Sequence, residues 1–223
     1  KFVKPVAGSY FINWANRKKI RKERHKDYLK QLPWCDMKAY EVLFNGIPEG
    51  SHVHLSNSTP VRYTQLFDHQ RNLWFWSNRG TSGIDGCVST AAGAAMATND
   101  TVTVITGDIG FFYDSNALWN HHLTPNFKII LINNGGGNIF RILPGPDNYP
   151  VMGPFLETAH SLHADGLASN FGLGYFVASD EKQLEEVLPA FYAESQRPAL
   201  LEIFTPAETS AETLKNYFKY LIS

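Results

Sequence analysis

Two short apolar runs, residues 101–106 and 128–133, constrain this chain more than any other feature. Neither run shows the polar alternation of a half-exposed strand, which predicts two strands covered on both faces of a parallel sheet. Residues 111–123 between them have the length of a crossover helix, so the three segments predict a βαβ unit. The first run ends at the Gly-Asp pair 107–108, and the second ends in the NNGGG turn at 133–137. Both turns are then expected at the carboxyl edge of the sheet, where open α/β folds bind ligands.

The rest of the chain extends this unit into one domain. We predict an α/β fold with a mainly parallel six-stranded sheet flanked by helices, the last of which covers an edge of the sheet. Residues 1–31 are predicted to be the tail of a preceding domain or a linker helix, and residues 32–223 to be a C-terminal domain. Residues 145–154 are predicted to form an exposed loop. The further strands are predicted at 52–55, 72–77, 174–178 and 199–204, and the helices at 36–46, 86–98, 155–171, 181–195 and 207–222.

Composition and charge exclude several classes of protein. The 223 residues are 43% apolar and carry a net charge of −1, which suits one large core. No apolar stretch reaches transmembrane length and no signal-peptide pattern opens the sequence, so we predict a cytoplasmic protein without a membrane span. Residues 17–30 hold eight Lys or Arg against two acids, but without interleaved aromatic residues they favour a solvated helix over a nucleic-acid interface. Cys35 and Cys87 fit neither a disulfide framework nor a zinc spacing and are predicted to be reduced.

Asp108 and Asn134 each follow a predicted strand directly and are 26 positions apart. Carboxylate and amide oxygens suit a hard cation, and a glycine carbonyl can approach a cation closely because no Cβ intervenes. Taken singly, Asp108 is more often a helix cap and NNGGG a flexible turn. Their joint placement predicts a magnesium site instead, with a diphosphate bound to the metal and to the backbone N–H groups of residues 109–111.

Three segments carry a resemblance to a known family: SNRGTSGIDG at 77–86, GDIGFFYDSNAL at 107–118 and NNGGGNIFRILP at 133–144. The Gly-Asp pair followed by Asn-Asn resembles the signature of thiamine-diphosphate enzymes. More narrowly, the three segments resemble the menaquinone-biosynthesis family of 2-succinyl-5-enolpyruvyl-6-hydroxy-3-cyclohexene-1-carboxylate synthases, over residues from about 52 to about 205. Most thiamine-diphosphate enzymes carry a small residue after Gly-Asp, so Ile109 narrows the resemblance to the menaquinone family.

This resemblance implies that the chain is the C-terminal, diphosphate-binding part of a transferase that decarboxylates 2-oxoglutarate and adds the succinyl unit to isochorismate. It implies thiamine diphosphate as the cofactor, with magnesium, or manganese in its place, held by Asp108, Asn134 and the Gly136 carbonyl. It also implies that Ile84 lies under the cofactor and holds its two rings in a V shape. The implied cofactor residues are Thr81, Gly83, Ile84, Gly107, Asp108, Ile109, Gly110, Asn134, Gly136, Asn138 and Ile139, and the implied substrate residues are Ser58, Arg62, Arg79, Ile139, Phe140 and Leu143.

The resemblance further implies parts that this sequence lacks. The chain begins with Lys1 rather than methionine, so we expect a piece of a longer polypeptide. The glutamate that activates the cofactor is expected on the first domain of a partner subunit, in a homodimer or tetramer. No carboxylate here fits that role, because Asp108 is assigned to the metal and Asp85 is expected to cap a helix. The chain alone is therefore expected to be inactive, with its missing domains and small-molecule substrates as its partners.

Other interpretations stay open at this point. An acetolactate synthase-like enzyme or a 2-oxo-acid decarboxylase would share the cofactor, but the two predicted substrate arginines favour a multiply anionic substrate. A doubly wound domain that binds an ordinary dinucleotide would share the fold, but no GxGxxG follows the first strand. A non-catalytic nucleotide- or diphosphate-binding domain is favoured only if the missing upstream part has no activating glutamate. His160 and His163 have the spacing of a helical metal pair. Without a third ligand we favour surface or core positions for them, and for the adjacent histidines at 121–122.

Overall fold

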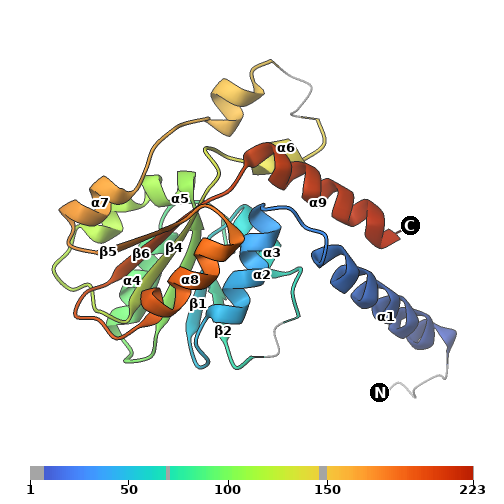
Figure 1. The fold of residues 1–223 in the computed structure, drawn as a ribbon, viewed down its shortest axis with the longest axis horizontal. Coiled ribbons are helices and arrows are strands. Elements are labelled where there is room, and N and C mark those ends of the chain that lie inside the picture. The colour runs from blue at the N-terminus through green and yellow to red at the C-terminus, as the bar shows by residue number, and fades with distance from the viewer. Residues whose placement is uncertain (1–7, 69–70, 146–149, 223) are drawn as a thin grey trace.

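The computed structural model describes residues 8–68, 71–145 and 150–222 (Figure 1). One six-stranded sheet lies at its centre, in the order β2-β1-β3-β4-β6-β5, and all neighbouring strands are parallel. This confirms the predicted α/β class, and the sheet is wholly rather than mainly parallel. The strands are β1 (His52–Leu55), β2 (Trp74–Ser77), β3 (Val102–Gly107), β4 (Phe127–Asn133), β5 (Gly174–Ala178) and β6 (Ala199–Phe204).

β3 and β4 form the middle of the sheet because their side chains are apolar on both faces. All seven residues of β4 are buried, and successive residues enter different cores. Ile129 and Leu131 join the core on one face. Ile130 and Ile132 join the core on the other face. The register pairs Gly107 with Ile132, so β3 and β4 end at the same level and the polar turns that follow are neighbours.

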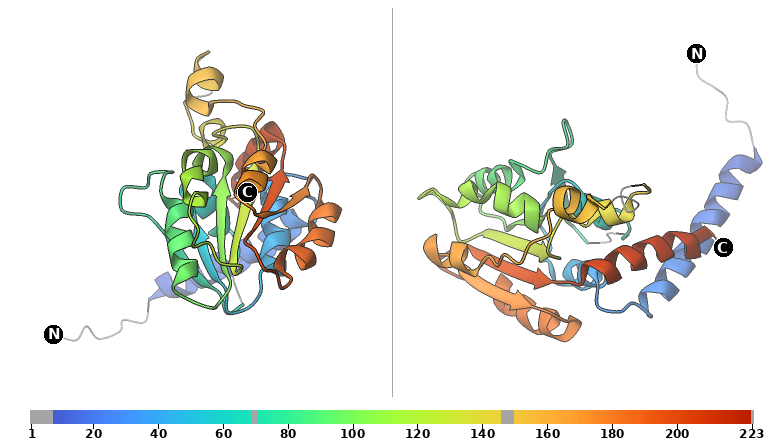
Figure 2. Two further views of the ribbon diagram at one scale, coloured as in Figure 1. Left: turned by 90° about the vertical axis from the view of Figure 1, so that its left-hand side faces the viewer. Right: turned by 90° about the horizontal axis from the view of Figure 1, so that it is seen from above.

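Helices cover both faces of the sheet, which gives the domain three layers (Figures 1 and 2). α2, α3 and α8 belong to one core, while α4, α5 and α7 belong to the other. The cap position of α4 is occupied by Gly86, which has no side chain, so the expected capping by Asp85 is wrong. The helices named here are α2 (Asp36–Gly46), α3 (Thr59–Thr64), α4 (Cys87–Met96), α5 (Asp108–Tyr113), α7 (Asp165–Asn170) and α8 (Glu181–Tyr192).

The connection from β3 to β4 contains less helix than the sequence predicts. A helix is predicted over 111–123, but α5 ends at Tyr113 and only a 3-10 turn, Ser115–Leu118, follows. Asp114 explains the break because its carboxylate accepts hydrogen bonds from the Ser89 N–H at 2.8 Å and the Ser89 hydroxyl at 2.6 Å. It thereby satisfies the first turn of α4.

The helix predicted over 155–171 is also replaced. A π-helical turn spans Met152–Glu157, residues 158–164 are irregular, and α7 begins at Asp165. Thr158 ends the π-helical turn with a φ of 53°, a left-handed conformation that a right-handed helix cannot continue. Within the loop predicted at 145–154, residues 146–149 lie outside the described residues, and Met152 already belongs to the π-helical turn.

The two terminal helices pack against each other beyond the carboxyl edge of the sheet (Figure 2). α1 (Ser9–Leu29) is the predicted polar helix, and the Tyr28 hydroxyl donates to the carbonyl of Thr213 at 2.9 Å. α9 (Ala207–Ile222) packs on α1, α2 and α6, so the prediction that it covers a sheet edge is wrong. The division between a tail or linker and the domain stays a prediction.

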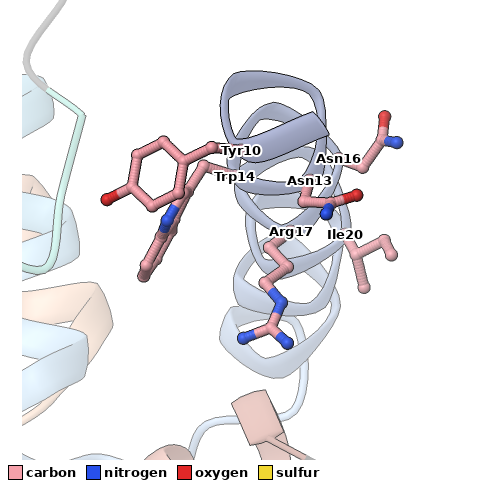
Figure 3. A pocket seen from close by; sticks show the side chains of 6 residues that line it. All are labelled: Tyr10, Asn13, Trp14, Asn16, Arg17 and Ile20. Carbon is pink, nitrogen blue, oxygen red and sulfur yellow. The ribbon is translucent and has the colours of Figure 1, made fainter. Parts of the chain in front are cut away.

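The first half of α1 is exposed. Figure 3 shows Tyr10, Trp14 and Arg17 projecting from the helix. The described residues that line the hollow beside them all belong to α1. Cys35 and Cys87 are buried and free. In the ranges that the structure describes, no helix is both long and apolar enough to cross a membrane.

Candidate functional site

A cavity of about 350 Å³ opens at the carboxyl edge of the sheet. The turns after β1, β3 and β4 meet there, and α6 (Ile139–Ile142) and the end of the π-helical turn complete its wall. The lining therefore combines polar turn residues with apolar side chains. The lining residues are Ser56, Asn57, Ser58, Thr59, Pro60, Ile84, Gly107, Asp108, Ile109, Gly110, Tyr113, Asn134, Gly136, Gly137, Asn138, Ile139, Phe140, Leu156 and Thr158.

Asp108 is a buried carboxylate at the start of α5, with 3% of its surface exposed. It accepts hydrogen bonds from the backbone N–H groups of Ile109 at 2.7 Å, Gly136 at 2.9 Å and Asn134 at 3.2 Å. Burial raises the pKa of Asp108 to about 6, and the hydrogen bonds from the backbone and the neighbouring His160 oppose that rise. The βαβ unit thus brings the carboxylate directly against the glycine turn.

A second buried carboxylate fixes the orientation of Asn134. Asn134 Nδ2 donates to Asp36 Oδ2 at 3.1 Å, and Asp36 also accepts from the hydroxyls of Thr205 and Ser210. Burial raises the pKa of Asp36, and these hydrogen bonds oppose the rise. Because Nδ2 is bound to Asp36, Oδ1 of Asn134 is turned the other way, and this buried oxygen has no partner among the described residues.

The unpartnered oxygen indicates room for a polar ligand, because buried polar atoms in proteins are nearly always paired. Asn138 lies near Asp36, yet neither atom of its buried amide forms a hydrogen bond within the described part of the chain. At Gly136 a Cβ would lie 2.9 Å from the carbonyl oxygen of Glu157, so the turn needs glycine there. A carboxylate, an amide oxygen and a glycine carbonyl are a donor set that magnesium accepts.

Most of the predicted site residues lie around this one cavity. Ile84 reaches it from the loop before α4, and a Cβ on Gly110 would be 3.3 Å from the Ile84 carbonyl oxygen. The loop that carries Ile84 therefore packs closely against α5 at Gly110, where there is no side chain. The predicted residues that line the cavity are Ser58, Ile84, Gly107, Asp108, Ile109, Gly110, Asn134, Gly136, Asn138, Ile139 and Phe140.

Five predicted residues lie outside the lining. Arg79 is exposed and donates to Asn57 Oδ1 at 2.7 Å, and Asn57 itself lines the cavity. Arg62 is exposed and donates to the carbonyl of Ser58 at 2.7 Å. Each arginine is thus joined to the cavity through one lining residue. The remaining three are Thr81, Gly83 and Leu143.

Sequence reasoning missed Asp36 and His160. Asp36 has the pattern of an ordinary acid at a helix start, and only the tertiary fold brings it to Asn134, 98 positions away. His160 Nε2 lies 3.5 Å from Asp108 Oδ2, and 12% of its side chain is exposed. The helical pairing considered for His160 and His163 fails because this segment is not helical; the ring of His163 packs on Phe204 instead.

A wholly parallel sheet covered on both faces, with a partly polar cavity at its carboxyl edge, places the chain in the class of open α/β domains that bind ligands at that edge. The particular family follows from comparison with known proteins. Residues 58–203 match the family model described as "Thiamine pyrophosphate enzyme, C-terminal TPP binding domain". The chain belongs to this family.

Curated relatives match nearly the whole chain. It is 46% identical over 203 residues to the 2-succinyl-5-enolpyruvyl-6-hydroxy-3-cyclohexene-1-carboxylate synthase of Christiangramia forsetii, a match that covers 91% of this chain and 35% of the relative. It is 47% identical over 204 residues to the protein of the same name from Flavobacterium psychrophilum, covering 92% and 37%. The chain thus spans little more than a third of these relatives.

A solved structure supports the fold. It is from Mycobacterium smegmatis and is described as a thiamin diphosphate-dependent enzyme. The two structures align with a TM-score of 0.54 at 20% identity, over 78% of this chain and 32% of the other. At this identity the likeness concerns the fold alone.

Proposed function

We propose that this chain is the cofactor-binding domain of a 2-succinyl-5-enolpyruvyl-6-hydroxy-3-cyclohexene-1-carboxylate synthase. The observation that carries the proposal is the meeting of the buried Asp108 carboxylate with Asn134, whose side-chain oxygen has no partner among the described residues. The names of the curated relatives support the choice of enzyme. The complete enzyme decarboxylates 2-oxoglutarate and adds the remaining succinyl unit to isochorismate.

The donor set fits thiamine diphosphate held through magnesium, or through manganese in its place. Asp108, Asn134 and the Gly136 carbonyl would hold the metal. The Ile109 N–H is already bound to Asp108, so the next N–H groups at the start of α5 would bind the diphosphate. When bound, the cofactor would supply a thiazolium carbon that acts as a carbanion nucleophile, and a positively charged thiazolium ring that takes up the electron pair released by decarboxylation.

The apolar residues of the cavity would exclude water from the reacting carbon. Ile84 reaches the lining from the loop before α4, while Ile139 and Phe140 reach it from α6. Exclusion of water protects a carbanion from protonation and strengthens the electrostatic interactions around it. In this proposal Ile84 supports the bound cofactor, and the two α6 residues face the substrates.

The proposed substrates carry several carboxylates, and Arg62 and Arg79 are the proposed cations for them. A guanidinium binds a carboxylate through two parallel hydrogen bonds. Arg79 is joined to the lining through Asn57, and Arg62 is joined to it through Ser58. Both arginines can therefore act at the mouth of the cavity without contacting the metal ligands.

Replacing Arg79 by methionine in the complete enzyme should raise the KM for 2-oxoglutarate or isochorismate and leave thiamine diphosphate affinity unchanged. Loss of a charge-assisted pair costs about 2–5 kcal/mol, which steady-state kinetics detects. Arg71→Met is the matched control, because Arg71 is bound to Glu49 and to the Asn45 carbonyl and does not line the cavity. A loss of cofactor affinity with unchanged KM values would contradict the assignment.

The proposed function is tested with the complete polypeptide. Carbon dioxide release from 2-oxoglutarate should require isochorismate, thiamine diphosphate and magnesium together. Pyruvate separates the rival enzymes, because an acetolactate synthase-like enzyme or a decarboxylase of small 2-oxo acids would use it as the donor. Release from pyruvate but not from 2-oxoglutarate rejects the proposed substrate, and no cofactor binding at all favours a non-catalytic domain.

We further propose that the enzyme acts in the cytoplasm as a homodimer or tetramer. Its other partners would be preceding domains of the same polypeptide. The length of the relatives, of which this chain spans 35% and 37%, supports the preceding domains.

A further inference from the structure

The segment after the π-helical turn runs along the glycine turn that carries the proposed metal ligands. The Gly137 N–H donates to the Glu157 carbonyl at 2.6 Å, and the His160 N–H donates to the Gly135 carbonyl at 2.9 Å. These two hydrogen bonds flank Gly136, where a Cβ would lie 2.9 Å from the Glu157 carbonyl oxygen. The position of residues 157–160 therefore determines the conformation of the turn that presents the Gly136 carbonyl.

One ion pair anchors this segment from the side. The Glu157 side chain is 3% exposed, and both of its oxygens bind Arg141, one to Nε and the other to Nη2 at 2.9 Å. Arg141 lies on α6 and also approaches Glu208 at the start of α9, with 3.5 Å between Nη1 and the carboxylate. A bidentate pair holds the relative orientation of two elements more firmly than a single hydrogen bond does. Removing the partner of a buried carboxylate strongly destabilises the folded protein, because an unpaired charge is left buried.

The same segment places a histidine against Asp108. His160 Nδ1 accepts the Leu162 N–H at 3.1 Å, so Nδ1 is the unprotonated nitrogen of the ring and Nε2 carries the hydrogen. Nε2 lies 3.5 Å from Asp108 Oδ2 and forms no hydrogen bond in the described part of the chain. The backbone bond from Leu162 therefore points a donor at the carboxylate that we propose as a metal ligand.

We propose that Arg141 and Glu157 are positioning residues of the cofactor site. Their ion pair fixes residues 157–160 along the glycine turn, which sets the Gly136 carbonyl and holds His160 beside Asp108. Neither Arg141 nor Glu157 lines the cavity, so their effect on the bound group is indirect. This inference rests on the proposed function, since the group positioned is magnesium with thiamine diphosphate.

The test uses Arg141→Met, Arg141→Lys and Glu157→Gln in the complete enzyme. Magnesium-dependent binding of thiamine diphosphate, measured by titration calorimetry, should weaken about 10- to 100-fold in Arg141→Met and Glu157→Gln, the range found for residues that orient metal ligands. Arg141→Lys keeps the positive charge but cannot form two parallel hydrogen bonds with the carboxylate, so the cofactor affinity of this variant should be intermediate. In the cofactor-free protein, backbone amide hydrogens of residues 157–160 should exchange faster in the first two variants.

Lys38→Met is the matched control. Lys38 also bridges two acids, Glu41 at 2.7 Å and Glu181 at 3.5 Å, with 11% of its side chain exposed and no contact with the cavity. The Lys38→Met variant should lower the unfolding temperature without changing cofactor affinity.

The inference is overturned if the cofactor affinities of Arg141→Met and Glu157→Gln fall no further than that of Lys38→Met. It is also overturned if amide exchange at 157–160 is unchanged. If one variant fails to fold, the other decides. Failure of the unmodified enzyme to bind the cofactor rejects the proposed function instead, and the exchange experiment still decides the role of the ion pair.

Discussion

Replacing Asp108 by alanine should abolish magnesium-dependent binding of thiamine diphosphate. The carboxylate is buried and adjoins Asn134 and Gly136, so its loss removes the charged member of the proposed metal site. Residues that only orient a metal ligand change affinity by 10- to 100-fold, and removal of a ligand should exceed about 100-fold. The residual chain still offers N–H groups to the diphosphate, but without the metal most of the attraction is lost.

Titration calorimetry with the complete enzyme measures this loss. Asp114→Asn is the matched control, because Asp114 is also 3% exposed and accepts two hydrogen bonds, but from Ser89 outside the cavity. It should lower stability and leave cofactor affinity intact. Unchanged cofactor affinity in Asp108→Ala would contradict the assignment of Asp108 as a metal ligand. The main support for the proposed function would then be lost.

Residues 1–223 alone should show no turnover, even with saturating cofactor and substrates. In the proposed function, a shielded carboxylate would have to hold a proton at the aminopyrimidine of thiamine diphosphate to make the thiazolium carbon acidic. Among the described residues that line the cavity, Asp108 is the only acid, and it is proposed to bind the metal. Asp85 lies in the loop before α4 and is exposed to solvent, so it is not shielded. The activating carboxylate is therefore expected on another domain.

Carbon dioxide release from 2-oxoglutarate is the measurement, with the purified fragment alone and after addition of the first domain of the same enzyme. A cooperative thermal transition of the fragment serves as the control for folding. Turnover should appear only in the mixture. Turnover by the folded fragment alone would place the activating carboxylate within this chain.

The strands and the central turns could be predicted because their determinants are local. Continuous apolar runs define β3 and β4, and a parallel register then brings Asp108 and Asn134 together without further information. The helix lengths were less predictable. Asp114 ends α5 because it binds Ser89 of another helix, and no pattern within 111–123 reports that contact.

The parts of the site that escaped prediction depend on contacts between distant residues. His160 reaches Asp108 only because its segment leaves the helical conformation at Thr158 and pairs with the glycine turn. Apolar spacing alone favours a helix there, which would have directed the histidine elsewhere. The pairing of Arg141 with Glu157 is equally invisible in the sequence, because 16 positions separate the two residues and no local pattern links them.

The hydrogen bond from Asn134 to Asp36 bears on how the domain folds. It closes a loop of 98 residues, and Asp36 is joined in turn to residues 169 and 174 positions further along the chain. Contacts between such distant residues form slowly, because loop-closure entropy opposes them until the surrounding structure is in place. The amide of Asn134 is thus oriented only when the start of α2 and the start of α9 have come together. A ligand that binds this amide would therefore bind the completed fold and not a partly folded state, and it would raise the stability of the completed fold.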